Sequence, residues 1–153
     1  MKHRIRALTL SIALMSLGGC GGGESGAFLF NAFVGFWISD NCEADGASRS
    51  ERVTIRLTEL SETSLSGSFT VETYANTTCS GPPANTVQFA VRQEGTRTVD
   101  SGTAVKVTLA NPVETLKDLL FVRDRQLFRG LPGPLDADGF PSLIDFSNPL
   151  RLL

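Results

Sequence analysis

Histidine is almost missing from this chain. The only one, His3, stands among the first residues, inside a segment that has the features of a removable export signal. The rest of the chain therefore has no imidazole for a Ser-His-Asp or Cys-His arrangement, and none to ligate a metal ion. Triad hydrolases and His-bound metal centres are excluded on this ground.

Basic residues are also scarce once that segment is set aside. Without Lys2, Arg4 and Arg6 the chain keeps 11 Lys and Arg against 16 Asp and Glu, a formal charge of −5. It has no cluster of basic residues, which a nucleic-acid footprint would need, so we expect no nucleic-acid partner. Lys106 and Lys117 are the only lysines left, and Lys106 stands in a predicted strand opposite its apolar positions. A Ser-Lys nucleophile pair is therefore a poor interpretation.

The apolar run at the N-terminus is too short to cross a membrane. Residues 7–17 make a stretch of 11 residues, whereas a spanning helix needs about 20. Basic residues precede the run, and two small residues and Cys20 follow it. This order predicts a cleavable signal peptide over residues 1–19.

The tetrapeptide Leu17-Gly18-Gly19-Cys20 resembles the lipobox of bacterial lipoproteins. The resemblance implies that Cys20 accepts a diacylglycerol and that several acyl chains anchor the protein, because one chain alone binds only marginally. Gly21 in place of Asp implies sorting to the outer membrane, so we expect a lipid-anchored protein of the cell envelope, facing the periplasm or the cell surface. The alternatives are an ordinary signal peptide with a chance Cys and a retained apolar helix.

The organisation that follows has three parts. Residues 1–19 are the signal peptide, residues 20–27 are the lipidated Cys with a Gly-rich tether, and residues 28–153 form a single β domain. Cys42 and Cys79 then remain as an even pair in an oxidising compartment, and we predict that they form a disulfide between two turn-rich segments at one end of a sheet. Two free thiols, or a zinc site completed by carboxylates, are the alternatives.

Apolar and polar residues alternate in most of the domain, as half-buried strands require. About seven or eight short strands with turns between them predict an all-β fold, either an antiparallel up-and-down barrel or a sandwich. Residues 113–119 have an alternative interpretation as one helical turn, and residues 150–153 are expected to form an edge strand after a break at Asn148-Pro149. The expected strands are the second half of 28–38, then 52–59, 64–74, 86–93, 103–109, 118–123, 126–129 and a short one near Leu143.

Gly35-Phe36-Trp37 resembles the Gly-x-Trp that opens lipocalin and lipocalin-like barrels. The order Trp37, Cys42, an alternating hairpin, Phe69, Tyr74 and Cys79, with a later segment over residues 138–145, is similar to small uncharacterised bacterial proteins of that kind. The resemblance implies a barrel in which Trp37, Phe69 and Tyr74 either close one end or line a ligand site. It also implies a late basic residue over the Trp37 ring, either Arg129 or Arg151.

Carboxylates are the remaining candidates for chemistry. Asp136 and Asp138 are near neighbours, and Asp40, Glu43 and Asp45 cluster before the second strand. Paired carboxylates can hydrolyse glycosides, and Asp136-Ala137-Asp138-Gly139 resembles part of a calcium loop whose other ligands are missing. The alternative interpretation is a solvated turn in which Asp bonds to its own backbone. We identify no catalytic residue, metal site or cofactor.

The function that these observations favour is a non-enzymatic binding or interaction module of the cell envelope, held to the membrane by the lipid on Cys20. Its partner would be a small hydrophobic ligand if the barrel is hollow, and an envelope protein or glycan if the barrel is filled. The alternatives are a structural envelope lipoprotein and, ranked last, a carboxylate enzyme that acts on glycans.

Overall fold

Antiparallel strands close into a barrel in the computed structural model, which describes residues 30–39, 42–44, 46, 48–61 and 64–153. The predicted signal peptide, Cys20 and the tether therefore lie outside the described residues. The strands of the described part are β1 (Gly35–Ser39), β2 (Glu43–Ala44), β3 (Ser50–Ser61), β4 (Ser64–Tyr74), β5 (Asn85–Val99), β6 (Gly102–Ala110), β7 (Thr115–Arg123), β8 (Gln126–Gly130) and β9 (Ile144–Leu152).

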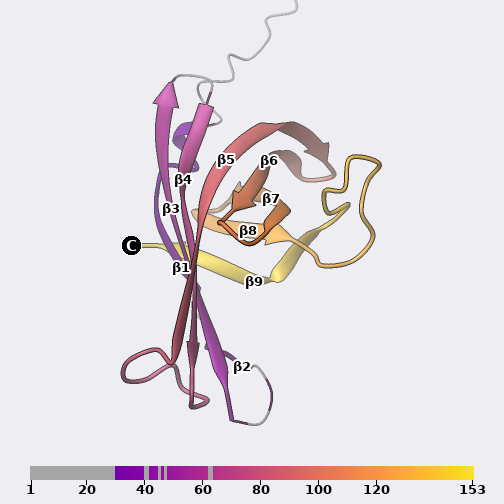
Figure 1. The fold of residues 1–153 in the computed structure, drawn as a ribbon. Coiled ribbons are helices and arrows are strands. Elements are labelled where there is room, and N and C mark those ends of the chain that lie inside the picture. The colour runs from indigo at the N-terminus through magenta and orange to yellow at the C-terminus, as the bar shows by residue number, and fades with distance from the viewer. Residues whose placement is uncertain (1–29, 40–41, 45, 47, 62–63) are drawn as a thin grey trace, which may run out of the picture.

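The sheet closes because β1 pairs with β3 on one side and with β9 on the other. The remaining strands pair in chain order, all antiparallel, so β1 and β3–β9 make an eight-stranded up-and-down barrel (Figure 1). The two-residue strand β2 is an additional strand outside the eight of the barrel, and it pairs with the first part of β3. The all-β prediction is confirmed, and of its two architectures the barrel forms and the sandwich does not.

The core lies inside the barrel because the apolar positions of neighbouring strands are in register. Trp37 is paired with Ile55, Ile55 with Phe69, and Phe69 with Phe89, so residues directly opposite one another share the inner face. The buried side chains of this interior cluster are Phe30, Phe33, Trp37, Ile55, Leu57, Leu65, Phe69, Phe89, Val91, Val105, Val107, Leu109, Leu120, Leu127 and Leu150.

One end of the barrel is closed by the segment that precedes β1. Residues 30–33 make a single turn in which the Phe33 amide donates to the Phe30 carbonyl at 2.9 Å, and both phenyl rings are buried. The Trp37 indole N–H donates to the Phe33 carbonyl at 2.8 Å. Residues 30–33, which belong to the half of 28–38 that was not predicted as a strand, therefore form this closing turn.

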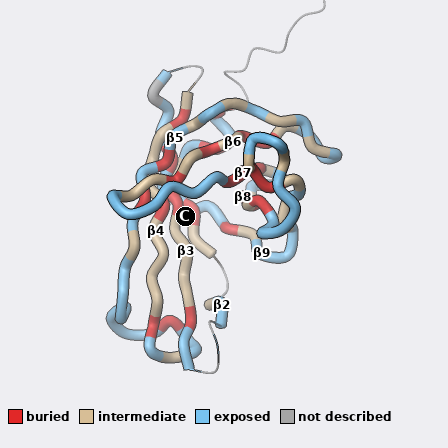
Figure 2. Tube along the Cα trace, turned by 45° about the vertical axis from the view of Figure 1, so that its right-hand side comes forward, coloured by how far each residue is buried: buried red, intermediate tan, exposed pale blue. Residues whose placement is uncertain are grey.

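β3, β4 and β5 continue past the barrel at its other end. Figure 1 shows this extension running down beside β2, below the level of β9. Buried residues are concentrated in the barrel, and the extension is mostly half-buried or exposed (Figure 2). A disulfide joins Cys42, just before β2, to Cys79 in the β4–β5 connection, with 5.7 Å between their Cα atoms, so the predicted disulfide is confirmed.

Two strand predictions need correction. Residues 113–119 do not form a helical turn, because β7 begins at Thr115 and pairs with β6. The final strand is not an edge broken at Pro149, since β9 runs through this proline and closes the barrel against β1. Pro149 is tolerated because it lies where the β8–β9 register shifts, so its missing N–H breaks no regular ladder.

Candidate functional site

The three aromatic residues that the sequence grouped together are divided by the fold. Trp37 and Phe69 both belong to the interior cluster, whereas Tyr74 lies outside the barrel, near the end of the extension. Its hydroxyl donates to Glu72 Oε2 at 2.7 Å, and the Arg52 guanidinium lies 5.5 Å from its ring centroid. The hydrogen bond to Glu72 is the main cause that raises the pKa of Tyr74.

The open end of the barrel, between the extension and β8–β9, carries the charged groups that reach the interior. We call it the mouth. It surrounds a cavity of about 170 Å³, slightly larger than the roughly 150 Å³ that accommodates one benzene. The residues that line the mouth are Ser39, Glu43, Val53, Arg129, Gly130, Pro132, Asp145, Asn148 and Leu150.

A half-buried ion pair holds the one basic side chain, Arg129, among the described residues that line the mouth. Arg129 on β8 donates from Nε and Nη2 to Asp118 Oδ2, both at 2.8 Å. The other oxygen, Oδ1, accepts the amides of Leu119 at 2.8 Å and Gly130 at 2.9 Å. The Asp118 side chain is 6% exposed and that of Arg129 is 34% exposed. Such a pair is tolerated at this depth because every carboxylate oxygen has donors.

Arg129 also reaches across the interior of the barrel. Its guanidinium carbon lies 4.5 Å from the centroid of the Phe69 ring, a cation–π contact between β8 and β4. The sequence predicted Arg129 or Arg151 over the Trp37 ring. Arg129 packs on Phe69 instead, and Arg151 is an exposed residue of β9. The fold therefore places the Arg129 side chain at the mouth.

Asp145 is the second carboxylate beside Arg129 and is its register partner on β9. It accepts the Ser147 amide at 2.9 Å, the Ser147 hydroxyl, and the Asn148 side-chain amide at 3.0 Å. The bond from the Ser147 hydroxyl is the largest cause that lowers the pKa of Asp145, and the nearby Arg129 charge lowers it further. Asp145 is therefore ionised at neutral pH.

The mouth as a whole has more negative than positive charge. Among the described residues that line the mouth, Glu43 and Asp145 are acidic and Arg129 is the one cation, and Arg129 is already paired with Asp118. A ligand with a positive or neutral polar group is favoured at such a site, whereas a carboxylate would meet like charges. A general acid needs a raised carboxyl pKa at neutral pH, and the pKa of Asp145 is shifted in the opposite direction.

Asp136 and Asp138, the sequence's paired carboxylates, lie outside the barrel in the connection between β8 and β9. Lys106 Nζ lies 3.3 Å from Asp136 Oδ2 and 3.0 Å from Asp138 Oδ2, and Arg97 also pairs with Asp136 at 3.1 Å. Asp136 Oδ1 accepts the amides of Asp138 and Phe140. This is the local backbone bonding expected of a turn, and both acids are neutralised by cations.

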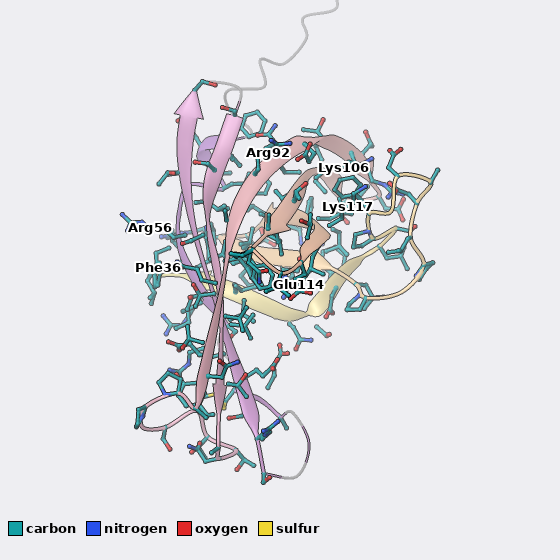
Figure 3. All side chains as sticks on the ribbon, viewed as in Figure 1. Phe36, Arg56, Arg92, Lys106, Glu114 and Lys117 are labelled. Atoms are coloured by element: carbon teal, nitrogen blue, oxygen red, sulfur yellow. A yellow bond between two sulfur atoms is a disulfide. The ribbon has the colours of Figure 1, made fainter. Side chains whose placement is uncertain are left out.

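The connection that these ion pairs hold covers a second apolar cluster, on the outer face of β6–β8. Lys106 and Lys117 both lie over the Phe140 ring, with their Nζ atoms 4.7 Å and 5.0 Å from its centroid, and Figure 3 shows both lysines on this side of the barrel. A lysine opposite the apolar face of its strand is expected to be solvated. The Lys106 side chain is instead largely covered, with 17% of it exposed. The buried residues of this outer cluster are Ala104, Leu119, Phe121, Phe128 and Phe140.

The Asp118–Arg129 pair is the functional feature that the sequence did not reveal. The strands predicted over 118–123 and 126–129 do pair, as parts of β7 and β8, and the turn between them has positive φ at both Asp124 and Arg125. The register of these strands pairs Leu120 with Arg129, which makes Asp118 a diagonal neighbour of Arg129 on the same face. The alternation Leu116, Asp118, Leu120 and Val122 was the available signal, and the helical alternative for residues 113–119 obscured it.

Of the other sequence candidates, Glu43 lines the mouth, while Asp40 and Asp45 lie outside the described residues. Within the described ranges, no group of three or more His, Cys, Asp and Glu side chains is placed to hold a metal ion. In the same part of the chain, no helix has both the length and the hydropathy needed to span a membrane.

No family model, curated protein or solved structure matches this chain.

Proposed function

We propose that this protein is a lipid-anchored, non-enzymatic binding module of the bacterial cell envelope, and that the mouth of its barrel is the binding site. Residues 1–19 would direct export and Cys20 would carry the lipid, as the lipobox resemblance implies. The observation that supports binding at the mouth is a filled apolar barrel with a polar, charged cavity at its open end.

The size of this cavity argues for a small polar ligand rather than a lipocalin-like hydrophobic one. Drug-sized ligands occupy pockets of about 300–1,000 Å³, and the mouth offers about 170 Å³. The interior beyond it is occupied by the Phe69, Phe89 and Trp37 side chains. The ligand we propose is a molecule, or the end of a larger one, with an ammonium or hydroxyl group.

The charges that line the mouth also favour a small polar ligand. The ionised Asp145 carboxylate and Glu43 would attract an ammonium group, and the Asn148 amide and Ser39 hydroxyl supply neutral hydrogen-bonding groups nearby. The Asp118–Arg129 pair would hold the Arg129 side chain in place and keep its own charges internally compensated. Preformed polar groups of this kind orient a ligand without needing a large buried area.

Ethanolamine and acetate serve as probes of matched size and opposite charge. We expect amide NMR signals of Gly130 and Asp145 to shift on titration with ethanolamine and to shift much less with acetate. Asp145→Asn should weaken the ethanolamine response, whereas Asp124→Asn, in an exposed turn, should leave it unchanged. Equal responses to both probes, or shifts confined to residues away from the mouth, would refute the proposed site.

A further inference from the structure

We infer that the outer surface of β1, together with Leu153 beside it, is the face that rests on an anionic lipid bilayer. The inference rests on the proposed lipid anchor at Cys20 and adds the orientation of the domain. We call this surface the Phe36 face and define it by Val34, Phe36, Arg56 and Leu153. Its apolar side chains are 37%, 41% and 62% exposed for Val34, Phe36 and Leu153 respectively.

The strand geometry brings these residues together on the outside of the barrel. Trp37 is buried inside, so its neighbour Phe36 points outward, since successive side chains of a strand alternate. Arg56 is the register partner of Phe36 on β3, and the Leu153 amide donates to the Phe36 carbonyl at 2.9 Å. Figure 3 shows Phe36 and Arg56 projecting on the side away from Lys106 and Lys117.

The chemistry of the Phe36 face suits a membrane interface. Exposed aromatic and aliphatic side chains can enter the boundary between headgroups and acyl chains, and an arginine beside them is attracted to anionic headgroups. The outward residues of β3 on either side of Arg56 are Thr54 and Thr58, both uncharged. The contact thus has an apolar centre and a cation, without a neighbouring carboxylate on this stretch of β3.

The length of chain between Cys20 and the described residues lets the Phe36 face reach the membrane. Ten peptide steps separate Cys20 from Phe30, and ten steps reach at most about 36 Å. Val34 and Phe36 follow Phe30 within six residues. An acylated Cys20 would therefore hold this face at a high effective concentration near the bilayer, so a contact that is weak by itself becomes populated.

The experiment uses the acylated protein in vesicles of phosphatidylglycerol and phosphatidylcholine. An environment-sensitive fluorophore is attached at Phe36→Cys or, as the matched control, at Val113→Cys, with the Cys42–Cys79 disulfide kept oxidised. Val113 is 92% exposed in the connection between β6 and β7, and β6 lies across the barrel from β1 in strand order. Flotation of the vesicles and the mass of the Cys20 peptide report the anchor separately.

We expect brominated lipid to quench the label at position 36, with a blue-shifted emission, and to leave the label at position 113 unchanged. Adding Arg56→Glu should reduce the quenching at position 36 without releasing the protein from the vesicles. Equal solvent exposure at both positions in floating, acylated protein would overturn the orientation and leave the anchor intact. Shielding of position 36 from aqueous iodide without lipid quenching would indicate a second protein copy and overturn it as well. If the protein exported by its own host carries no acyl mass on the Cys20 peptide and does not float with the vesicles, the anchor and this inference are overturned together.

Discussion

Asp118 holds the arginine of the mouth in place, because its carboxylate, with a side chain only 6% exposed, joins three backbone or side-chain partners. It accepts from the amides of Leu119 and Gly130 and from Arg129. Removing one partner of a buried ion pair leaves the other charge poorly solvated, and this penalty exceeds the attraction that was lost. The pair therefore holds the shape of the site more than it adds net stability.

Arg129→Met tests this role. Because the Arg129 side chain is one-third exposed, water can partly replace it, and we expect a loss of about 2–3 kcal/mol in the free energy of unfolding. Arg92→Met is the control, since the Arg92 side chain is 79% exposed and pairs at 3.1 Å with Glu94 on the same strand, and should cost less than about 0.5 kcal/mol. Urea unfolding followed through Trp37 fluorescence measures both. Equal losses would contradict the role given to Asp118.

Gly67 on β4 is required for a different reason. A Cβ atom there would lie 1.9 Å from the Arg56 carbonyl oxygen, so Gly67→Ala must push β3 and β4 apart. We expect a loss of about 2–3 kcal/mol, as for overpacked cores. Gly133→Ala should be nearly neutral, since its nearest atom is the Leu131 carbonyl oxygen at 4.0 Å. Thermal unfolding of the two variants measures both losses of stability. A Gly67→Ala protein as stable as the parent would show that β3 and β4 can separate freely.

At the scale of elements, strand positions were predictable where the alternation was clean and unpredictable where it was not. β4 forms over the predicted residues 64–74, because each inward position has an apolar, small or Thr residue. β5 runs to Val99, six residues beyond the predicted end, because a register shift between Gln93 and Gly95 lets it continue around the barrel. A single sequence does not show such a shift, since it depends on pairing with β6.

The connection between β8 and β9 is expected to be sensitive to acid. The Phe140 amide and the nearby Lys106 lower the pKa of Asp136, and the pKa of Asp145 is lowered as well. A carboxyl whose pKa is lower in the folded state stabilises it above the unfolded pKa, about 3.9, and this contribution is lost as the pH falls through the lowered value.

Stability should therefore decline below about pH 4, and Asp136→Asn should show a smaller decline from a less stable starting point. Asp124→Asn, in the exposed β7–β8 turn, should follow the unmodified protein. Hydrogen exchange at the Phe140 amide, measured at neutral pH and at pH 3, reports the opening of this connection directly. Unchanged protection at the acid pH would contradict the assigned ion pairs.

The disulfide is the cross-link that ties the extension together. It joins residues 37 positions apart, for which the loop-entropy model gives about 4 kcal/mol. We expect the Cys42→Ala, Cys79→Ala double variant to lose stability of this order, whereas Cys20→Ala should leave the stability of the domain unchanged. Urea midpoints under non-reducing conditions compare the two. A double variant as stable as the parent would show that the extension is held by its strand pairing alone.

At the scale of the whole molecule, barrel closure and the position of the site are long-range properties. The Gly-x-Trp resemblance indicated a barrel, and Trp37 does lie inside it. The pairing of β1 with β9, however, joins residues more than a hundred positions apart, and local patterns carry no signal for it. The mouth depends on the same closure, because Ser39 and Glu43 from the start of the domain meet Asp145 and Asn148 near its end.

The mass of the protein isolated from the membranes of its own host, recorded intact and under denaturing conditions, tests the central proposal most directly. We expect a chain of residues 20–153 that carries a diacylglycerol and further acyl mass on Cys20, with the two hydrogens of one disulfide missing. The full 153-residue chain, unacylated and recovered from the soluble cytoplasmic fraction, would contradict the proposal that this barrel is a lipid-anchored module of the cell envelope.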